Sequence, residues 1–152
     1  MREKTRTEDA FAETWHLLNE LQNEKVYDYI WFSLHHWGDR MYDPRPYAKT
    51  TDSIVTELQN VKVVLPAYIL QKVEDYNSKI KDSLLKVREL YNTLAEGNIV
   101  LINPETLVGC EELRKESFKL GNDVGYLGRY LQEEVIDFAL RNTFPSIGGT
   151  TE

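Results

Sequence analysis

The chain has little cysteine, glycine or proline and no long apolar run, and each scarcity narrows what the protein can be. Cys110 is the only cysteine, so no disulfide forms within the chain, as is usual in a reducing compartment. Eight glycines and five prolines in 152 residues argue against a turn-rich all-β fold. No apolar run approaches the roughly 20 residues that a membrane-spanning helix needs. The start, "MREKTRTEDA", also lacks the apolar core of a signal peptide. We therefore expect a cytoplasmic protein that has no membrane contact.

Basic charge is scarce relative to acidic charge. The 18 lysines and arginines are outnumbered by 25 aspartates and glutamates, which leaves a formal net charge of -7. Nucleic acids are bound through clusters of basic side chains. The densest basic stretch, between residues 79 and 88, is interleaved with acidic residues and is typical of a solvated helix face. We expect no nucleic-acid partner, and the acidic balance favours a partner protein with a basic surface.

Helical periodicity dominates what the chain does contain. Between residues 69 and 94, eight apolar side chains recur about every 3.6 residues, which is the period of a straight α-helix. A second stripe with the same period, from 113 to 138, passes through Gly121, Gly125 and Gly128. Three glycines inside a helix cost about 3 kcal/mol relative to alanine. Either the helix breaks near Gly121, which is the interpretation we favour, or the glycines let another backbone come close.

Local signals place the other elements. Thr5 and Glu8 have the spacing of a capping box, so the first helix should begin near residue 7. Residues 24–36 are either a continuation of that helix, since nothing between residues 21 and 25 forces a break, or a second helical stretch, and Gly38 is placed to end it near residue 36.

Two kinds of segment should lie outside the helices. Pro44 and Pro46 predict a loop over residues 38–50. Two short apolar segments, 61–65 and 98–102, lie at opposite ends of the long helix. They are therefore expected to be connectors that cover the ends of the bundle rather than paired strands.

These signals together predict an all-α fold, a bundle of four to six helices with long antiparallel helices and no substantial sheet. A single domain should occupy residues 1–144 and a flexible C-terminal tail residues 145–152. The expected helices cover approximately residues 7–36, 51–63, 66–95, 104–120 and 122–142.

No set of residues has the arrangement of a known catalytic centre. Glu13 and His16 form one Glu-x-x-H pair, but carboxylate-bridged two-metal bundles need that pair twice, with further glutamates. Glu13, His16 and His35 are the residues from which a metal site would be built, yet we expect no bound metal and no other cofactor. Cys110 has no histidine near it in sequence, so we interpret it as a spectator thiol.

The segment 29–47, "YIWFSLHHWGDRMYDPRPY", is the one stretch whose composition exceeds what a bundle requires. Its aromatic side chains suit a loop pinned over the end of the bundle, because they bury area while keeping a polar group in water. Aromatic and arginine-rich composition is equally typical of a protein interface. A small-ligand pocket, with a histidine as proton donor and arginines as anion clamps, is the third interpretation. The candidate partner- or ligand-binding residues are His36, Trp37, Arg40, Tyr42, Arg45 and Tyr47.

By exclusion, the sequence predicts a non-enzymatic helical-bundle protein that binds or regulates a protein partner as an interaction, scaffold or inhibitor module. The alternative is a small-ligand-binding or metal-dependent enzyme with its pocket at the corner formed by residues 29–47. Two long apolar stripes with glycines in one of them also favour a homodimer.

Overall fold

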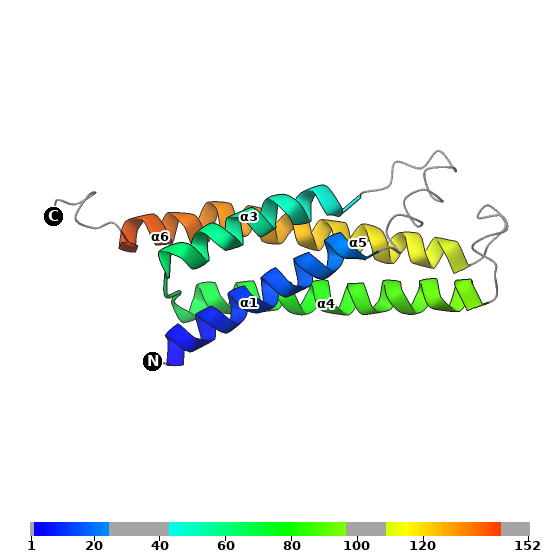
Figure 1. The fold of residues 1–152 in the computed structure, drawn as a ribbon, viewed down its shortest axis with the longest axis horizontal. Helices are drawn as coiled ribbons and strands as arrows, with labels where there is room; N and C mark the ends of the chain where they lie inside the picture. Colours follow the sequence, from blue (N-terminus) through cyan, green and yellow to red (C-terminus); the bar gives the residue numbers. More distant parts are fainter. Residues whose placement is uncertain (1, 25–42, 97–108, 144–152) are drawn as a thin grey trace.

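The computed structural model describes residues 2–24, 43–96 and 109–143, which form an all-α bundle without strands in those ranges (Figure 1). The fold class predicted from periodicity is therefore confirmed. Among these residues, no helix combines the length and apolarity needed to cross a bilayer. The helices are α1 (Arg2–Asn23), α3 (Arg45–Val61), α4 (Ala67–Glu96) and a last rod made of α5 (Gly109–Tyr130), the π-helical turn η2 (Leu131–Val135) and α6 (Ile136–Thr143).

The helices alternate in direction along the chain. α1 and α4 run one way, and α3 and the last rod run the other way (Figure 1). α4 packs against α5 and α1, while α3 packs against α1 and α5, so α3 lies diagonally opposite α4. The connector between those two helices must therefore cross the end of the bundle. This arrangement makes α3 and α5 parallel neighbours, and it is their seam that forms the candidate site described below.

The connector 62–66 closes that end of the bundle with apolar side chains. Val63 and Leu65 are buried, and the backbone N–H of Leu65 donates a hydrogen bond to the hydroxyl of Thr7 at 3.1 Å. The prediction of a connector rather than a strand is confirmed for residues 62–65, whereas Val61 is the last residue of α3. The other predicted connector, 98–102, lies outside the described residues.

The long central helix is the element that the sequence predicts best. It was expected over residues 66–95 and is α4, Ala67–Glu96, thirty residues that span about 45 Å at 1.5 Å per residue. Six of the eight residues of its stripe are buried, and Tyr76 and Tyr91 are partly buried against the same core. Because the stripe is uninterrupted, α4 is one long helix, and it contacts both α1 and α5.

The favoured break at Gly121 is wrong. α5 continues through Gly121, Gly125 and Gly128 to Tyr130, and the only irregularity in the described part of this rod is the π-helical turn ten residues later. The stripe of the rod is buried against the core from Leu113 to Val135, and Phe138 is partly buried, which favours a continuous helix by more than the glycines cost. The alternative interpretation, close approach of another backbone, is the one that Gly128 supports.

The first helix is displaced from its predicted range. α1 begins at Arg2 rather than near residue 7, and Thr7 lies inside it, where the side chain is buried and its hydroxyl accepts a hydrogen bond from the Leu65 N–H. It ends at Asn23, with Glu24 already outside the helix, so the predicted continuous helix 7–36 is wrong. The remainder of that range, from residue 25, lies outside the described residues.

The start of α3 also differs from its prediction. The expected loop 38–50 is helical from Arg45 onward, so the predicted range 51–63 is wrong at its beginning. Pro46 is compatible with this start, because the first N–H groups of a helix have no intrahelical partner and proline lacks only such a group. The Asp43 carboxylate accepts a hydrogen bond from the Arg45 backbone N–H at 3.1 Å, which supplies the partner that the helix itself does not.

Polar contacts along the α1–α4 seam define how those two parallel helices are aligned. Arg6 at one end of α1 pairs with Glu74 at 2.6 Å, and at the other end Glu20 and Glu24 both contact Arg88, at 3.2 Å and 2.7 Å. The basic partner is on α1 at one end and on α4 at the other. A reversed or shifted α1 would place like charges together, so these pairs favour one alignment.

A buried hydrogen-bonded group lies between the two ion-pair clusters. Asn77 donates to the carbonyl oxygen of Ala10 at 3.1 Å, and its Oδ1 lies 2.7 Å from the hydroxyl of Thr14. Both side chains are nearly inaccessible to solvent, and a buried polar group left without its partner costs about 1–3 kcal/mol. The alignment of α1 on α4 is thereby also defined in the middle of the seam.

Candidate binding groove

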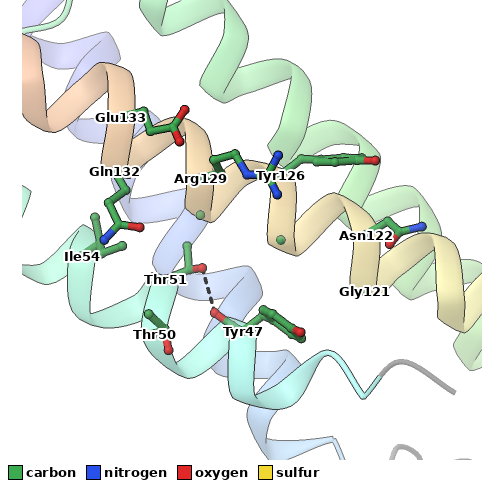
Figure 2. Close-up of a pocket in the computed structure, with 12 residues that line it drawn as sticks. Tyr47, Thr50, Thr51, Ile54, Gly121, Asn122, Tyr126, Arg129, Gln132 and Glu133 are labelled. Atoms are coloured by element: carbon green, nitrogen blue, oxygen red, sulfur yellow. Dashed lines mark hydrogen bonds between the residues drawn. The ribbon is translucent and has the colours of Figure 1, made fainter. Parts of the chain in front are cut away.

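A groove of about 460 Å³ lies between α3 and the last rod of the bundle (Figure 2). It follows the two parallel helices, with α3 on one side and α5 continuing into η2 on the other. The residues that line it are Tyr47, Thr50, Thr51, Ile54, Gly121, Asn122, Gly125, Tyr126, Gly128, Arg129, Gln132 and Glu133.

Glycines form the floor of the groove, and two of them differ in surroundings. A Cβ atom added to Gly128 would lie 2.6 Å from Oγ1 of Thr51, so the missing side chain lets α3 and α5 come close at this point. The Thr51 hydroxyl donates to the carbonyl oxygen of Tyr47 at 2.7 Å, which holds that side chain in place (Figure 2). A Cβ atom on Gly125 would meet nothing within 4 Å. Gly128 therefore serves the packing of the fold, whereas the space above Gly125 belongs to the groove.

The rim carries aromatic and charged side chains. Tyr47 is 42% exposed and Tyr126 is 51% exposed, on opposite sides of the groove (Figure 2). Arg129 and Glu133 are the two charged residues of the lining, and both are exposed. The rim thus combines two tyrosines with one charge of each sign.

Two of the six candidate residues predicted from sequence fall within the described chain. Tyr47 lines the groove from the first turns of α3, but Arg45 does not line it. Arg45 holds the Asp43 carboxylate through Nε at 3.0 Å and Nη2 at 2.9 Å, so its visible role is to organise the start of α3. The other four candidates, His36, Trp37, Arg40 and Tyr42, lie outside the described residues.

Sequence reasoning missed the α5 side of this site. The signal was present as the glycines at 121, 125 and 128, but these were interpreted first as a helix break. Asn122, Tyr126 and Arg129 then belong to the outward face of a continuous helix, which is where a groove can use them.

The predicted metal candidates are not assembled into a site in the described chain. Glu13 and His16 lie on α1, where Nε2 of His16 is 3.1 Å from Oε2 of Glu20 and the imidazole is 61% exposed. His35 lies outside the described residues. Within the described ranges, no group of three histidine, cysteine, aspartate or glutamate side chains could hold a metal ion.

Three buried polar side chains outside the groove lining have atoms without a hydrogen-bond partner. Asp123 on α5 is 8% exposed and one of its carboxylate oxygens has no hydrogen-bond partner. The hydroxyls of Ser83 on α4 and Ser117 on α5 are also buried and also have no hydrogen-bond partner. Burial raises the pKa of Asp123 above its ordinary value, although the positive charges of Lys79 and Lys119 act in the opposite direction. Such a carboxylate destabilises the folded protein once it is ionised.

The Asp123→Asn variant should therefore be more stable than the wild type at pH 7. Because burial raises the pKa of Asp123 in the folded protein above its ordinary value, the folded protein holds this proton more tightly than the unfolded chain. The protonated Asp123 carboxyl therefore stabilises the wild type fully below the pKa that it has in the unfolded chain. This stabilisation is lost as the pH rises through the pKa that Asp123 has in the folded protein. Urea unfolding from pH 4 to pH 7 should show the gain of the variant growing with pH. Asp82→Asn, at an exposed position of α4, is the control; an equal, pH-independent gain in both would contradict the prediction.

The fold and the groove define this molecule as a helical bundle with a candidate binding groove between two parallel helices. Comparison with models of known protein families, with curated proteins and with solved structures found no match. The function is therefore inferred from the chemistry and shape of this groove.

Proposed function

We propose that the protein is a non-enzymatic interaction module that binds a helical segment of a partner protein in the α3–α5 groove. The observation that carries the proposal is a glycine floor flanked by half-exposed Tyr47 and Tyr126. Tyrosine and arginine are enriched where protein partners contribute most binding energy. The cytoplasmic location expected from the sequence belongs to the same proposal.

The shape of the groove supports a helix as the bound element. Its lining extends from Gly121 to Glu133 on one side, and twelve residues of helix rise about 18 Å, or three turns. Helices pack with their axes 8–10 Å apart, and the smaller distances need small residues at the contact. Gly125, with open space above it, supplies that small residue. An amphipathic helix laid into a groove is a recurring mode of peptide recognition.

Site-specific photo-crosslinking tests the proposal. A photoreactive amino acid at Thr50, inside the groove, should crosslink to a small set of defined proteins when the chain is expressed in cells. Gly125→Trp should abolish those products, because the indole fills the groove and its Cβ meets nothing within 4 Å. Tyr68, 74% exposed on α4 and not part of the lining, is the control position and should not form the same products.

Two outcomes would contradict the interaction module. Identical products from Thr50 and Tyr68, or products unchanged by Gly125→Trp, would show that the groove does not bind the partner. A large thermal stabilisation by one class of metabolite that Gly125→Trp removes would support the ligand-binding alternative instead.

A further inference from the structure

We propose that the partner in the groove is a second copy of this chain, whose α5 lies antiparallel across α5 of the first copy. This inference rests on the proposed function, since it names the occupant of the same groove. Three observations on the groove carry it: the space above Gly125, the order of the rim residues along α5, and the balance of charge.

The space above Gly125 is not needed by the packing of a single chain. Gly128 is explained by the contact with Thr51, but a side chain at Gly125 would meet nothing within 4 Å. A glycine in a helix interior costs about 1 kcal/mol relative to alanine. A second helix that crosses α5 within one turn of Gly125 would use the space, because the absence of a Cβ there lets the two helices approach closely.

The rim residues are ordered so that two copies of α5 complement each other. In a two-fold symmetric pair, a residue before the axis on one helix faces a residue equally far beyond it on the other. We place the axis on the exposed face of α5, at the height between Leu127 and Gly128. Tyr126 then faces Arg129 of the second copy. An arginine over the face of a tyrosine ring is a favourable cation–π contact, and symmetry provides it twice.

The same axis pairs a second set of rim residues. Asn122 on α5 then faces Glu133 of the second copy, so the amide N–H groups can donate to the carboxylate. Asn122 and Glu133 both line the groove, and Glu133 is exposed. The contact again occurs twice, and it gives each Glu133 carboxylate a donor from the second copy.

Charge balance favours a second copy over a strongly charged partner. The whole chain carries a formal charge of -7, which opposes self-association through most of its surface. The groove lining has one arginine and one glutamate, so its net charge is zero. A basic partner helix would repel Arg129, and an acidic one would repel Glu133. In an antiparallel second copy, Arg129 faces Tyr126 and Glu133 faces Asn122, so neither charge faces a like charge.

Light scattering coupled to size-exclusion chromatography measures the association directly. The wild type at 100 μM should elute at twice the chain mass of 17.8 kDa. Gly125→Trp should elute as a monomer with an unchanged helical circular dichroism spectrum. Ser78→Trp, which adds the same bulk at an exposed position of α4, should remain a dimer. A monomeric wild type, or a dimer that Gly125→Trp leaves intact, would overturn the proposal.

Disulfide crosslinking tests the register in a background that carries Cys110→Ser. A mixture of Tyr126→Cys and Arg129→Cys chains should form a mixed disulfide dimer rapidly under mild oxidation. Tyr126→Cys mixed with Tyr68→Cys should form it at least tenfold more slowly. Equal rates in the two mixtures would overturn the antiparallel arrangement. If the wild type is a monomer but Thr50 still crosslinks to other proteins in a Gly125-dependent manner, the second copy is excluded while the interaction module stands.

Discussion

The Leu84→Ala variant is expected to lose about 2–5 kcal/mol of unfolding free energy. Leu84 is 1% exposed and lies in the middle of the apolar stripe of α4, the helix that contacts both α1 and α5. Truncation to alanine removes buried methyl groups and leaves a cavity that long, mutually packed helices can close only in part. The loss should appear as a lower midpoint in urea unfolding with an unchanged slope.

The adjacent residue provides a matched control for this prediction. Leu85 has the same side chain in the same helix but is 49% exposed. Leu85→Ala should change the unfolding free energy by no more than about 0.5 kcal/mol, as is usual for exposed positions. A similar loss in both variants would mean that α4 does not bury the face described above, and it would contradict the bundle arrangement.

The Gly128→Val variant is expected to lose about 3 kcal/mol. Its Cβ would lie 2.6 Å from Oγ1 of Thr51, and the two methyl groups of valine extend further toward α3. Rotation of Thr51 away from the clash would break the hydrogen bond that its hydroxyl donates to the Tyr47 carbonyl oxygen, so relief of the clash also costs free energy. Thermal and urea unfolding of the variant should both show the loss.

A second glycine and a double variant separate the clash from the effect of adding any side chain. At protein concentrations low enough for the chain to be monomeric, Gly125→Ala should stabilise it by about 1 kcal/mol, because alanine has a higher helix propensity than glycine and the new Cβ meets nothing within 4 Å. Combining Gly128→Ala with Thr51→Ala should be less destabilising than the sum of the two single changes. Equal effects of alanine at positions 125 and 128 would show that α3 does not approach Gly128 closely.

Local patterns in the sequence determined the helical class and the longest helix. An uninterrupted stripe with the α-helical period can bury its apolar side chains only as one long helix, so α4 is predicted within one residue at each end. The connector 62–65 was also predictable, since a short apolar segment at the end of a long rod has no strand within reach.

Helix boundaries depended on contacts that residues far apart in the chain make. Thr7 has the identity of a capping residue, but it lies inside α1, where its hydroxyl accepts a hydrogen bond from the N–H of Leu65, 58 residues away. Pro46 is compatible both with a loop and with a first helical turn, and the Asp43 contact to the Arg45 N–H accompanies the helical start in the folded protein. Sequence spacing alone does not distinguish these alternatives, because each one satisfies the same local rules.

The candidate site was decided by the tertiary structure. The glycines of α5 signalled either a break or a close approach, and the buried stripe at Leu120, Val124 and Leu127 favours the continuous helix. Gly128 then permits the contact with Thr51, while Gly125 remains open and forms a groove floor. Helix propensity is a local property, so every glycine inside a helix destabilises it by a similar amount. Which glycine faces a neighbouring helix and which faces open space depends on how the helices pack, and only the folded bundle specifies that.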